Sequence, residues 1–131
     1  MNKTKPFIAF VLTAFMAAGC QETLEDRCER EAREYTEKHC PTAVAPGIVM
    51  DSMTFEKPSQ TVSYYYTLTG KLDTAATFNE KSRQLLLDQI KNSANLRLYK
   101  EAGYSFRYVY HSKKNKGLQL YETLFKQKDY Q

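Results

Sequence analysis

The chain has 131 residues, of which 42% are hydrophobic and 26% are charged, and its formal net charge is +4. This length suits one domain with a core of modest size and excludes an assembly of several independent domains. No run of residues approaches the ~20 consecutive apolar positions of a permanent membrane-spanning helix.

The amino terminus has the order of segments that is typical of an export signal. Lys3 and Lys5 precede a twelve-residue apolar run, residues 7–18, and small residues lead into Cys20. These residues resemble the signal peptides of bacterial lipoproteins. The resemblance implies that Cys20 receives diacylglycerol, becomes the acylated first residue after cleavage, and anchors the mature protein to a membrane.

The processing site departs from the lipoprotein pattern at one position. Lipoproteins usually carry Leu three residues before the cysteine, whereas this chain has Ala17. Ala17 and Gly19 also fit the small-x-small rule of the ordinary signal peptidase, which would leave Cys20 as a free amino-terminal thiol. In the lipoprotein family the next residue influences sorting, and Gln21 implies an outer-membrane lipoprotein facing the periplasm, with the inner membrane or cell surface as alternatives.

Charge is distributed unevenly along the mature chain. Removal of Lys3 and Lys5 lowers the formal charge from +4 to +2, so the mature chain as a whole is not strongly basic. Residues 21–56 hold nine acidic and four basic side chains, whereas residues 57–131 hold six acidic and thirteen basic ones. The two segments can therefore pair with each other or face different partners.

Residues 23–39 are predicted to form a polar helix. Thr23 followed by Asp26 is a capping pattern, and the apolar stripe is thin, so the helix either docks on the domain or stands off it as a stalk. The stripe consists of Leu24, Cys28, Ala32 and Tyr35. Acid-before-base pairs at four-residue spacing are Asp26 with Arg30, Glu29 with Arg33, and Glu34 with Lys38.

This helix conflicts with a disulfide between Cys28 and Cys40, which an oxidising periplasm would otherwise favour. Twelve residues of continuous helix separate the two Cα atoms by ~18 Å, whereas a disulfide needs less than about 7 Å. Either the helix breaks early, or the thiols are unbridged within the chain, or one pairs with another molecule. The ion-pair spacing favours the helix, so we expect no bridge between Cys28 and Cys40.

The next segments are predicted to form a connector and a β-hairpin. Pro41 and Pro46 make residues 41–46 a connector. Residues 48–55 and 61–69 have strand-like sequences separated by a turn, and the second alternates with Val62, Tyr64, Tyr66 and Leu68 on one face.

The second half is predicted to repeat the order of helix and hairpin. We expect a core-facing helix from about residue 75 to 92, and a short helix at 96–102 that Gly103 ends. Residues 104–110 and 118–126 are predicted strands joined by a lysine-rich loop, and the tail to residue 131 is expected to fray.

These elements predict an α+β fold, with an N-terminal polar helix followed by a mostly antiparallel four-stranded sheet and one helix packed across it. We expect a signal peptide at residues 1–19, a lipid-anchored helix and linker at 20–46, and a small α+β domain at 47–131. The second half, including the stretch GYSFRYVY, resembles small secreted bacterial α+β domains of uncharacterised function.

Tyrosines and lysines are the candidate binding residues. Tyrosine rings can form a sugar- or peptide-binding surface, but they are also ordinary constituents of half-buried strands. A lysine loop can touch anionic headgroups or an acidic partner, but it can equally be a solvated hairpin tip. The candidates are Tyr64, Tyr65, Tyr66, Tyr108, Tyr110, Lys113, Lys114 and Lys116.

The sequence shows no motif that points to catalysis, a cofactor, a metal site or nucleic-acid binding. His39 and His111 stand alone, without the spacing of a zinc site. There is no Gly-x-Ser-x-Gly elbow, no Cys-x-x-Cys pair and no phosphate loop. We therefore expect no enzyme and no cofactor, although scattered carboxylates could converge in a hydrolase site that sequence does not reveal.

The sequence thus favours a membrane-anchored periplasmic lipoprotein that acts by binding an envelope protein as an assembly, inhibitor or immunity-type accessory factor. A tether through Cys20 would raise its effective concentration at the membrane. The alternative is a carrier that holds a lipid or glycan against an aromatic sheet face. A carrier requires a concave apolar pocket, whereas an interaction factor needs only an exposed patch.

Overall fold

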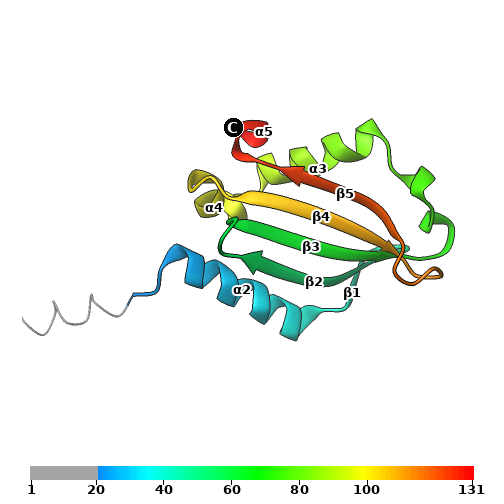
Figure 1. Ribbon diagram of the computed structural model, residues 1–131, viewed down its shortest axis with the longest axis horizontal. Helices are drawn as coiled ribbons and strands as arrows, with labels where there is room; N and C mark the ends of the chain where they lie inside the picture. The colour runs from blue at the N-terminus through cyan, green and yellow to red at the C-terminus, as the bar shows by residue number, and fades with distance from the viewer. Residues whose placement is uncertain (1–20) are drawn as a thin grey trace, which may run out of the picture.

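The computed structural model describes residues 21–131, which form helices and one sheet (Figure 1). The predicted signal peptide, residues 1–19, and Cys20 lie outside the described residues. No helix within 21–131 has both the length and the apolar character needed to cross a membrane. In chain order the elements are α2 (Leu24–His39), β1 (Thr42–Ala45), β2 (Ile48–Glu56), β3 (Thr61–Leu68), η1 (Gly70–Leu72), η2 (Ala75–Thr77), α3 (Glu80–Asn92), η3 (Ala94–Leu96), α4 (Arg97–Glu101), β4 (Ser105–Ser112), β5 (Gln119–Phe125) and α5 (Gln127–Tyr130).

The α+β fold is confirmed, but the sheet has five strands rather than four, in the order β1-β2-β3-β4-β5. The additional strand is β1, which lies in the segment predicted to be a connector. It is only four residues long and lies between Pro41 and Pro46, so its sequence carries no strand periodicity. Strand β1 pairs with the start of β2, and Gly47, with a positive φ of 81°, makes the tight turn between the two strands.

The two predicted hairpins differ in how they join. Strands β2 and β3 pair antiparallel, as do β4 and β5, whereas β3 and β4 pair in parallel. Parallel pairing is possible because the long segment containing α3 and α4 carries the chain back to the start of the sheet. Its register aligns Val62 with Phe106 and Tyr64 with Tyr108, so large side chains of the two halves share one face.

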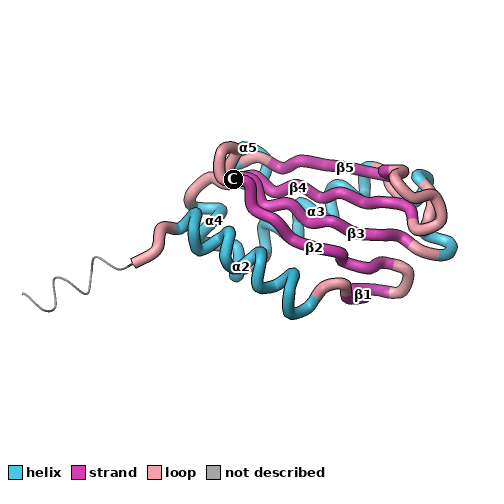
Figure 2. Tube along the Cα trace, turned by 60° about the horizontal axis from the view of Figure 1, so that its bottom comes forward, coloured by secondary structure: helices cyan, strands magenta, loops and turns pink. Residues whose placement is uncertain are grey.

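Helices α2, α3 and α4 pack on this aromatic face; Figure 2 shows α3 behind the strands and α2 along the β2 side. Ile90 of α3, Phe106 of β4 and Phe125 of β5 are fully buried between the layers. The core is completed by Cys28, Ala32, Phe55, Val62, Leu68, Leu87, Tyr99, Tyr104, Tyr108 and Tyr110.

Helix α2 begins and ends as predicted, but its ion pairs differ from those expected. Thr23 is the N-cap and accepts a hydrogen bond from the Asp26 amide at 3.0 Å. The predicted pairs of Asp26 with Arg30, Glu29 with Arg33, and Glu34 with Lys38 are wrong. Lys57 of the β2–β3 turn binds Asp26 at 2.6 Å and Glu29 at 3.6 Å, because docking brings it alongside the helix.

Two boundaries in the second half also differ from the prediction. Helix α3 begins at Glu80 rather than near residue 75, because the Asn79 side chain caps the amides of Lys81 and Ser82. The tail is not frayed, since α5 places the Tyr130 hydroxyl 2.7 Å from the Tyr104 carbonyl oxygen.

The two described cysteines are unbridged and occupy different environments. Cys28 is buried in the middle of α2, whereas Cys40 follows the end of that helix and is partly exposed. The helix is continuous from Leu24 to His39, so it keeps the two thiols apart, which confirms the prediction that they form no bridge. Burial raises the pKa of the Cys28 thiol to about 12.

Candidate functional site

An open groove of about 730 Å³ lies between helix α2 and the segment that runs from the end of α3 into α4. The sheet forms the floor of this groove, which we call the tyrosine groove. The floor residues are Met50, Met53, Val62, Tyr64, Tyr66 and Tyr108. The α2 wall consists of Arg27, Cys28, Glu31, Ala32, Glu34, Tyr35, Lys38 and His39, and the opposite wall of Gln89, Ser93, Asn95, Leu96 and Tyr99.

Stacked tyrosine rings form much of the floor of the groove. The ring of Tyr108 lies 4.9 Å from that of Tyr64 and 6.3 Å from that of Tyr66, centroid to centroid. Parallel pairing of β3 and β4 brings these rings together, because it aligns alternate residues of the two strands. The three hydroxyls give an otherwise apolar floor groups that can donate or accept hydrogen bonds.

Burial shifts the ionisation of these phenols. It raises the pKa of Tyr66 to about 12 and raises the pKa values of Tyr64 and Tyr108 further above their ordinary range. The phenols are therefore neutral at physiological pH. The floor can take part in hydrogen bonding and apolar contact, but it offers no phenolate for acid–base chemistry.

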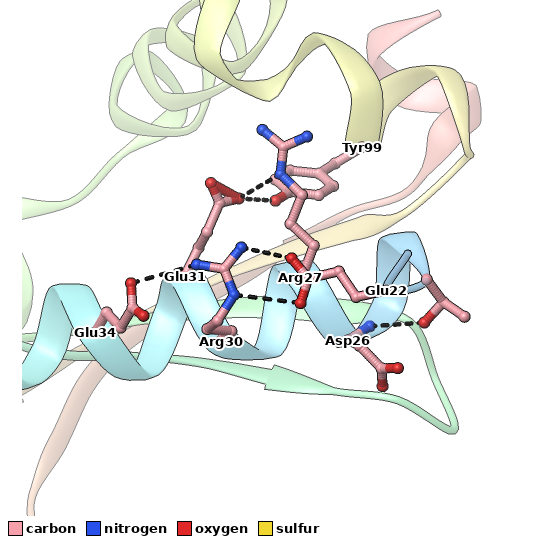
Figure 3. A network of polar contacts seen from close by, with 8 residues as sticks. Glu22, Asp26, Arg27, Arg30, Glu31, Glu34 and Tyr99 are labelled. Carbon is pink, nitrogen blue, oxygen red and sulfur yellow. Dashed lines mark hydrogen bonds and ion pairs between the residues drawn. The ribbon is translucent and has the colours of Figure 1, made fainter. Parts of the chain in front are cut away.

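A network of polar contacts holds the α2 wall in place (Figure 3). Glu31 accepts a hydrogen bond from the Tyr99 hydroxyl of α4 and pairs with Arg27 at 3.4 Å. Arg30 lies between Glu22, at 2.5 Å, and Glu34, at 3.4 Å. Because Tyr99 belongs to the opposite wall, its bond to Glu31 connects the two walls near the middle of α2.

The tyrosine groove contains three of the predicted binding residues, namely Tyr64, Tyr66 and Tyr108. Tyr110 lies on the same face, but Phe78 covers it, with ring centroids 4.8 Å apart. Tyr65 pairs with Ser52 and Val109 on the opposite face of the sheet, so it is separated from the groove by the sheet itself.

The lysine loop lies away from the groove, where β4 connects to β5. Lys113, Lys114 and Lys116 are exposed there. The buried Asp73 carboxylate accepts hydrogen bonds from the backbone amides of Lys113, at 3.1 Å, and Lys114, at 3.0 Å. This carboxylate fixes the loop backbone and leaves the lysine side chains in solvent.

The contribution of helix α2 to the groove was not predicted from the sequence. The apolar stripe that includes Cys28, Ala32 and Tyr35 was recognised, but the surface that it faces was not. The signal was present, because Glu31, Glu34 and Lys38 flank that stripe at helical spacing and must border whatever the stripe packs against. Met50 and Met53 were also missed, since residues 48–55 were predicted only to form a strand.

The chemistry of the groove is that of a binding surface. Apolar and aromatic groups form its floor, while charged and amide groups line its edges. Within residues 21–131, no cluster of three or more His, Cys, Asp or Glu side chains is arranged to hold a metal ion.

Two solved structures share this fold at low sequence identity. A candidate secreted protein from Pseudomonas aeruginosa superimposes with a TM-score of 0.69 at 15% identity, covering 85% of this chain and 100% of that one. The pilotin EpsS of the Vibrio vulnificus type 2 secretion system gives a TM-score of 0.61 at 14% identity, covering 82% of this chain and 92% of that one. At these identities the likeness shows the fold alone.

Sequence comparison identifies a family. No curated protein matches the sequence significantly. A family model described as a domain of unknown function, DUF8479, matches residues 23–121, from the N-cap of α2 into β5. This span contains every residue that lines the tyrosine groove. Because the match covers most of the chain, the protein belongs to the DUF8479 family.

Proposed function

We propose that the protein is a non-catalytic accessory factor of the bacterial cell envelope that holds a segment of a partner envelope protein in the tyrosine groove. The observation that carries this proposal is the groove itself, an open channel of about 730 Å³ with an apolar floor between two helical walls. An amphipathic helix fits such a site, because its apolar face can lie on the floor while its polar sides meet the walls.

The residues of the floor suit protein recognition. Tyrosine is enriched among the side chains that dominate binding energy, since its ring offers a large contact area and its hydroxyl a directed hydrogen bond. Met50 and Met53 add flexible side chains that can adapt to the shape of a partner. The stacked rings are already ordered, so binding costs little conformational entropy in the floor.

The amino terminus and the fold support an envelope location. The lipoprotein-like sequence ending at Cys20 would tether the domain to the outer membrane, and only residues 21–23 separate that cysteine from α2. The fold is also that of a pilotin from a type 2 secretion system, which is consistent with an accessory role. A tether of this kind raises the effective concentration of the groove near membrane-bound partners.

A second candidate function is a carrier for a lipid or glycan. The groove volume of about 730 Å³ lies within the ~300–1,000 Å³ typical of small-molecule sites. The phenol hydroxyls of the floor could hydrogen-bond a glycan, and its methionines could contact an acyl chain. The open position of the groove between α2 and the α3–α4 segment favours a peptide segment over these smaller ligands.

Photo-cross-linking in living cells tests the proposal. A photo-reactive residue is placed in the full-length chain at Gln89 or Asn95, both on the groove wall, or at Tyr65 on the opposite face as a matched control. We expect one reproducible protein adduct from the two groove positions and none from position 65. Adducts with lipid or glycan alone would support the carrier, and equal protein adducts from all three positions would refute the groove.

The membrane anchor requires a separate measurement, because it establishes location and not binding. In the Cys20→Ser variant the processing site lacks the thiol that is acylated. We expect fractionation to find the wild-type chain with the membranes and this variant in the soluble periplasm. A variant that has lost its signal peptide, as shown by its mass, and still stays with the membranes would contradict lipidation, whatever the cross-linking shows.

A further inference from the structure

The two walls of the tyrosine groove differ in charge. The wall formed by α2 carries the ionised side chains Arg27, Glu31, Glu34 and Lys38. The opposite wall offers the neutral polar side chains of Gln89, Ser93 and Asn95. Any electrostatic selection of a bound segment within the groove therefore comes from α2.

Both acidic groups of the α2 wall already have partners. Glu31 pairs with Arg27 at 3.4 Å and accepts a hydrogen bond from the Tyr99 hydroxyl. Glu34 pairs at 3.4 Å with Arg30, which lies one turn closer to the start of α2 (Figure 3). A cationic group on a partner would have to compete with these arginines for either carboxylate.

The cationic group at the other end of the wall is available. Lys38 is exposed and forms no ion pair with any residue of the described range 21–131. Its neighbour His39 contributes a second polar ring beside Tyr35, with centroids 4.9 Å apart. Both line the groove at the end of α2, where Met50 belongs to the floor.

Resting on the proposed function, we propose that the groove selects a partner segment that carries an acidic side chain at the Lys38 end. The segment places its apolar residues on the tyrosine floor and its carboxylate beside the Lys38 ammonium group. Docking displaces water from the apolar floor, which lowers the local dielectric and strengthens this pair relative to an exposed surface ion pair. Lys38 is thus a specificity-determining residue of the groove.

Charge reversal at Lys38 tests this assignment. The photo-reactive residue is fixed at Asn95, and adduct yields are compared for the wild-type background, Lys38→Glu and Arg33→Glu. Arg33 is a matched control because it is exposed on the same helix but lines the smaller hollow on the other flank of α2. We expect Lys38→Glu to lower the yield about tenfold, through like-charge repulsion, and Arg33→Glu to change it less than about twofold.

A charge swap completes the test. When an acidic residue of the cross-linked partner segment is replaced by Lys, the Lys38→Glu chain should recover its adduct. Equal yields for Lys38→Glu and Arg33→Glu, or no recovery from any acidic position of the segment, would overturn the assignment and leave the proposed function standing. Absence of a protein adduct in the wild-type background would instead contradict the proposed function, and this inference with it.

Discussion

Thr36 is the residue that joins helix α2 to the edge of the sheet. Strand β1 covers only the first part of β2, so the backbone groups of Met53 lie on an open strand edge. The Thr36 hydroxyl accepts a hydrogen bond from the Met53 amide and donates one to the Met53 carbonyl oxygen, both at 2.9 Å. One side chain therefore satisfies two backbone groups that would otherwise be available to another strand.

Replacement of Thr36 by Val should destabilise the domain. Valine has the same shape but forms neither bond, so two part-buried backbone groups lose their partner, at a cost of about 1–3 kcal/mol in the free energy of unfolding. Urea denaturation measures the change. Thr54→Val is the control, since Thr54 is exposed on the same strand and its replacement should stay within about 0.5 kcal/mol. Equal values for the two variants would contradict the role of Thr36.

The two described thiols should react at different rates. Burial raises the pKa of Cys28 to about 12, with a further contribution from Glu31, whereas Cys40 is partly exposed and its pKa is raised mainly by burial. In a Cys20→Ser chain at pH 8, we expect iodoacetamide to modify Cys40 about tenfold faster or more, as peptide mass spectrometry can measure. The difference should vanish in urea, and a faster reaction at Cys28 in the native chain would contradict its burial.

Asp73 should make the stability of the domain depend on pH. The Ser112 hydroxyl and the backbone amides of Lys114 and Lys113 lower the pKa of its carboxyl below the ordinary value of 3.8. Protonation therefore favours the unfolded chain, and the stabilisation is present above pH 3.8 and lost as the pH falls through the lower folded value.

The Asp73→Asn variant isolates this contribution. We expect it to unfold at lower urea concentration than the wild type at pH 7, and to lose less further stability between about pH 5 and pH 2. Urea midpoints measured over that range provide the comparison. Parallel pH profiles for the two chains would show that the Asp73 charge does not stabilise the folded loop.

At the scale of whole elements, α2 was the most predictable and the shortest elements the least. The cap at Thr23 and the apolar stripe at helical spacing define a helix locally, without reference to the rest of the molecule. The strand β1 and the helix α5 form only because other parts of the chain lie beside them. Each has four residues, too few for any period to be visible in the sequence.

The terminal helix α5 should contribute to stability even though its sequence predicts a frayed tail. Tyr130 packs edge-on against Phe106, with ring centroids 5.7 Å apart, and its hydroxyl donates to the Tyr104 carbonyl oxygen. Replacement of Tyr130 by Ala should lower the unfolding free energy by about 2 kcal/mol, as expected for loss of a partly buried aromatic side chain. Thermal denaturation checks this, with the exposed Lys128→Ala as control. Equal melting temperatures for Tyr130→Ala and the wild type would mean that the tail frays in solution.

At the scale of the whole molecule, the sequence identified the three tyrosines of the groove floor but not the groove. Alternation along β3 places Tyr64 and Tyr66 on one face, and this could be predicted. The parallel pairing of β3 with β4 and the docking of α2 decide which face the helices cover. They also leave a channel over these rings. These contacts join residues far apart in the chain, so no local pattern encodes them.

Alternation along β3 places Tyr65 and Tyr66 on opposite faces, and the long-range contacts decide which of the two lines the groove. The two residues are adjacent in β3 and chemically identical, yet Tyr66 lines the groove and Tyr65 lies on the opposite face. Both were predicted from the sequence as candidate binding residues. The two tyrosines are therefore a matched pair for mutation. Replacement of Tyr66 alters the groove, whereas replacement of Tyr65 alters only the opposite face of the sheet.

The most direct test of the groove is therefore the affinity of a synthetic partner segment, of the sequence that cross-linking identifies, for three chains. These are the wild type, Tyr66→Ala and Tyr65→Ala, with urea denaturation used to confirm that each chain is folded. Titration calorimetry should show that Tyr66→Ala weakens binding about tenfold or more, as for a tyrosine that dominates an interface, while Tyr65→Ala leaves the dissociation constant unchanged. A loss of affinity in Tyr65→Ala with full affinity in Tyr66→Ala would place the binding surface on the other face of the sheet and contradict the account.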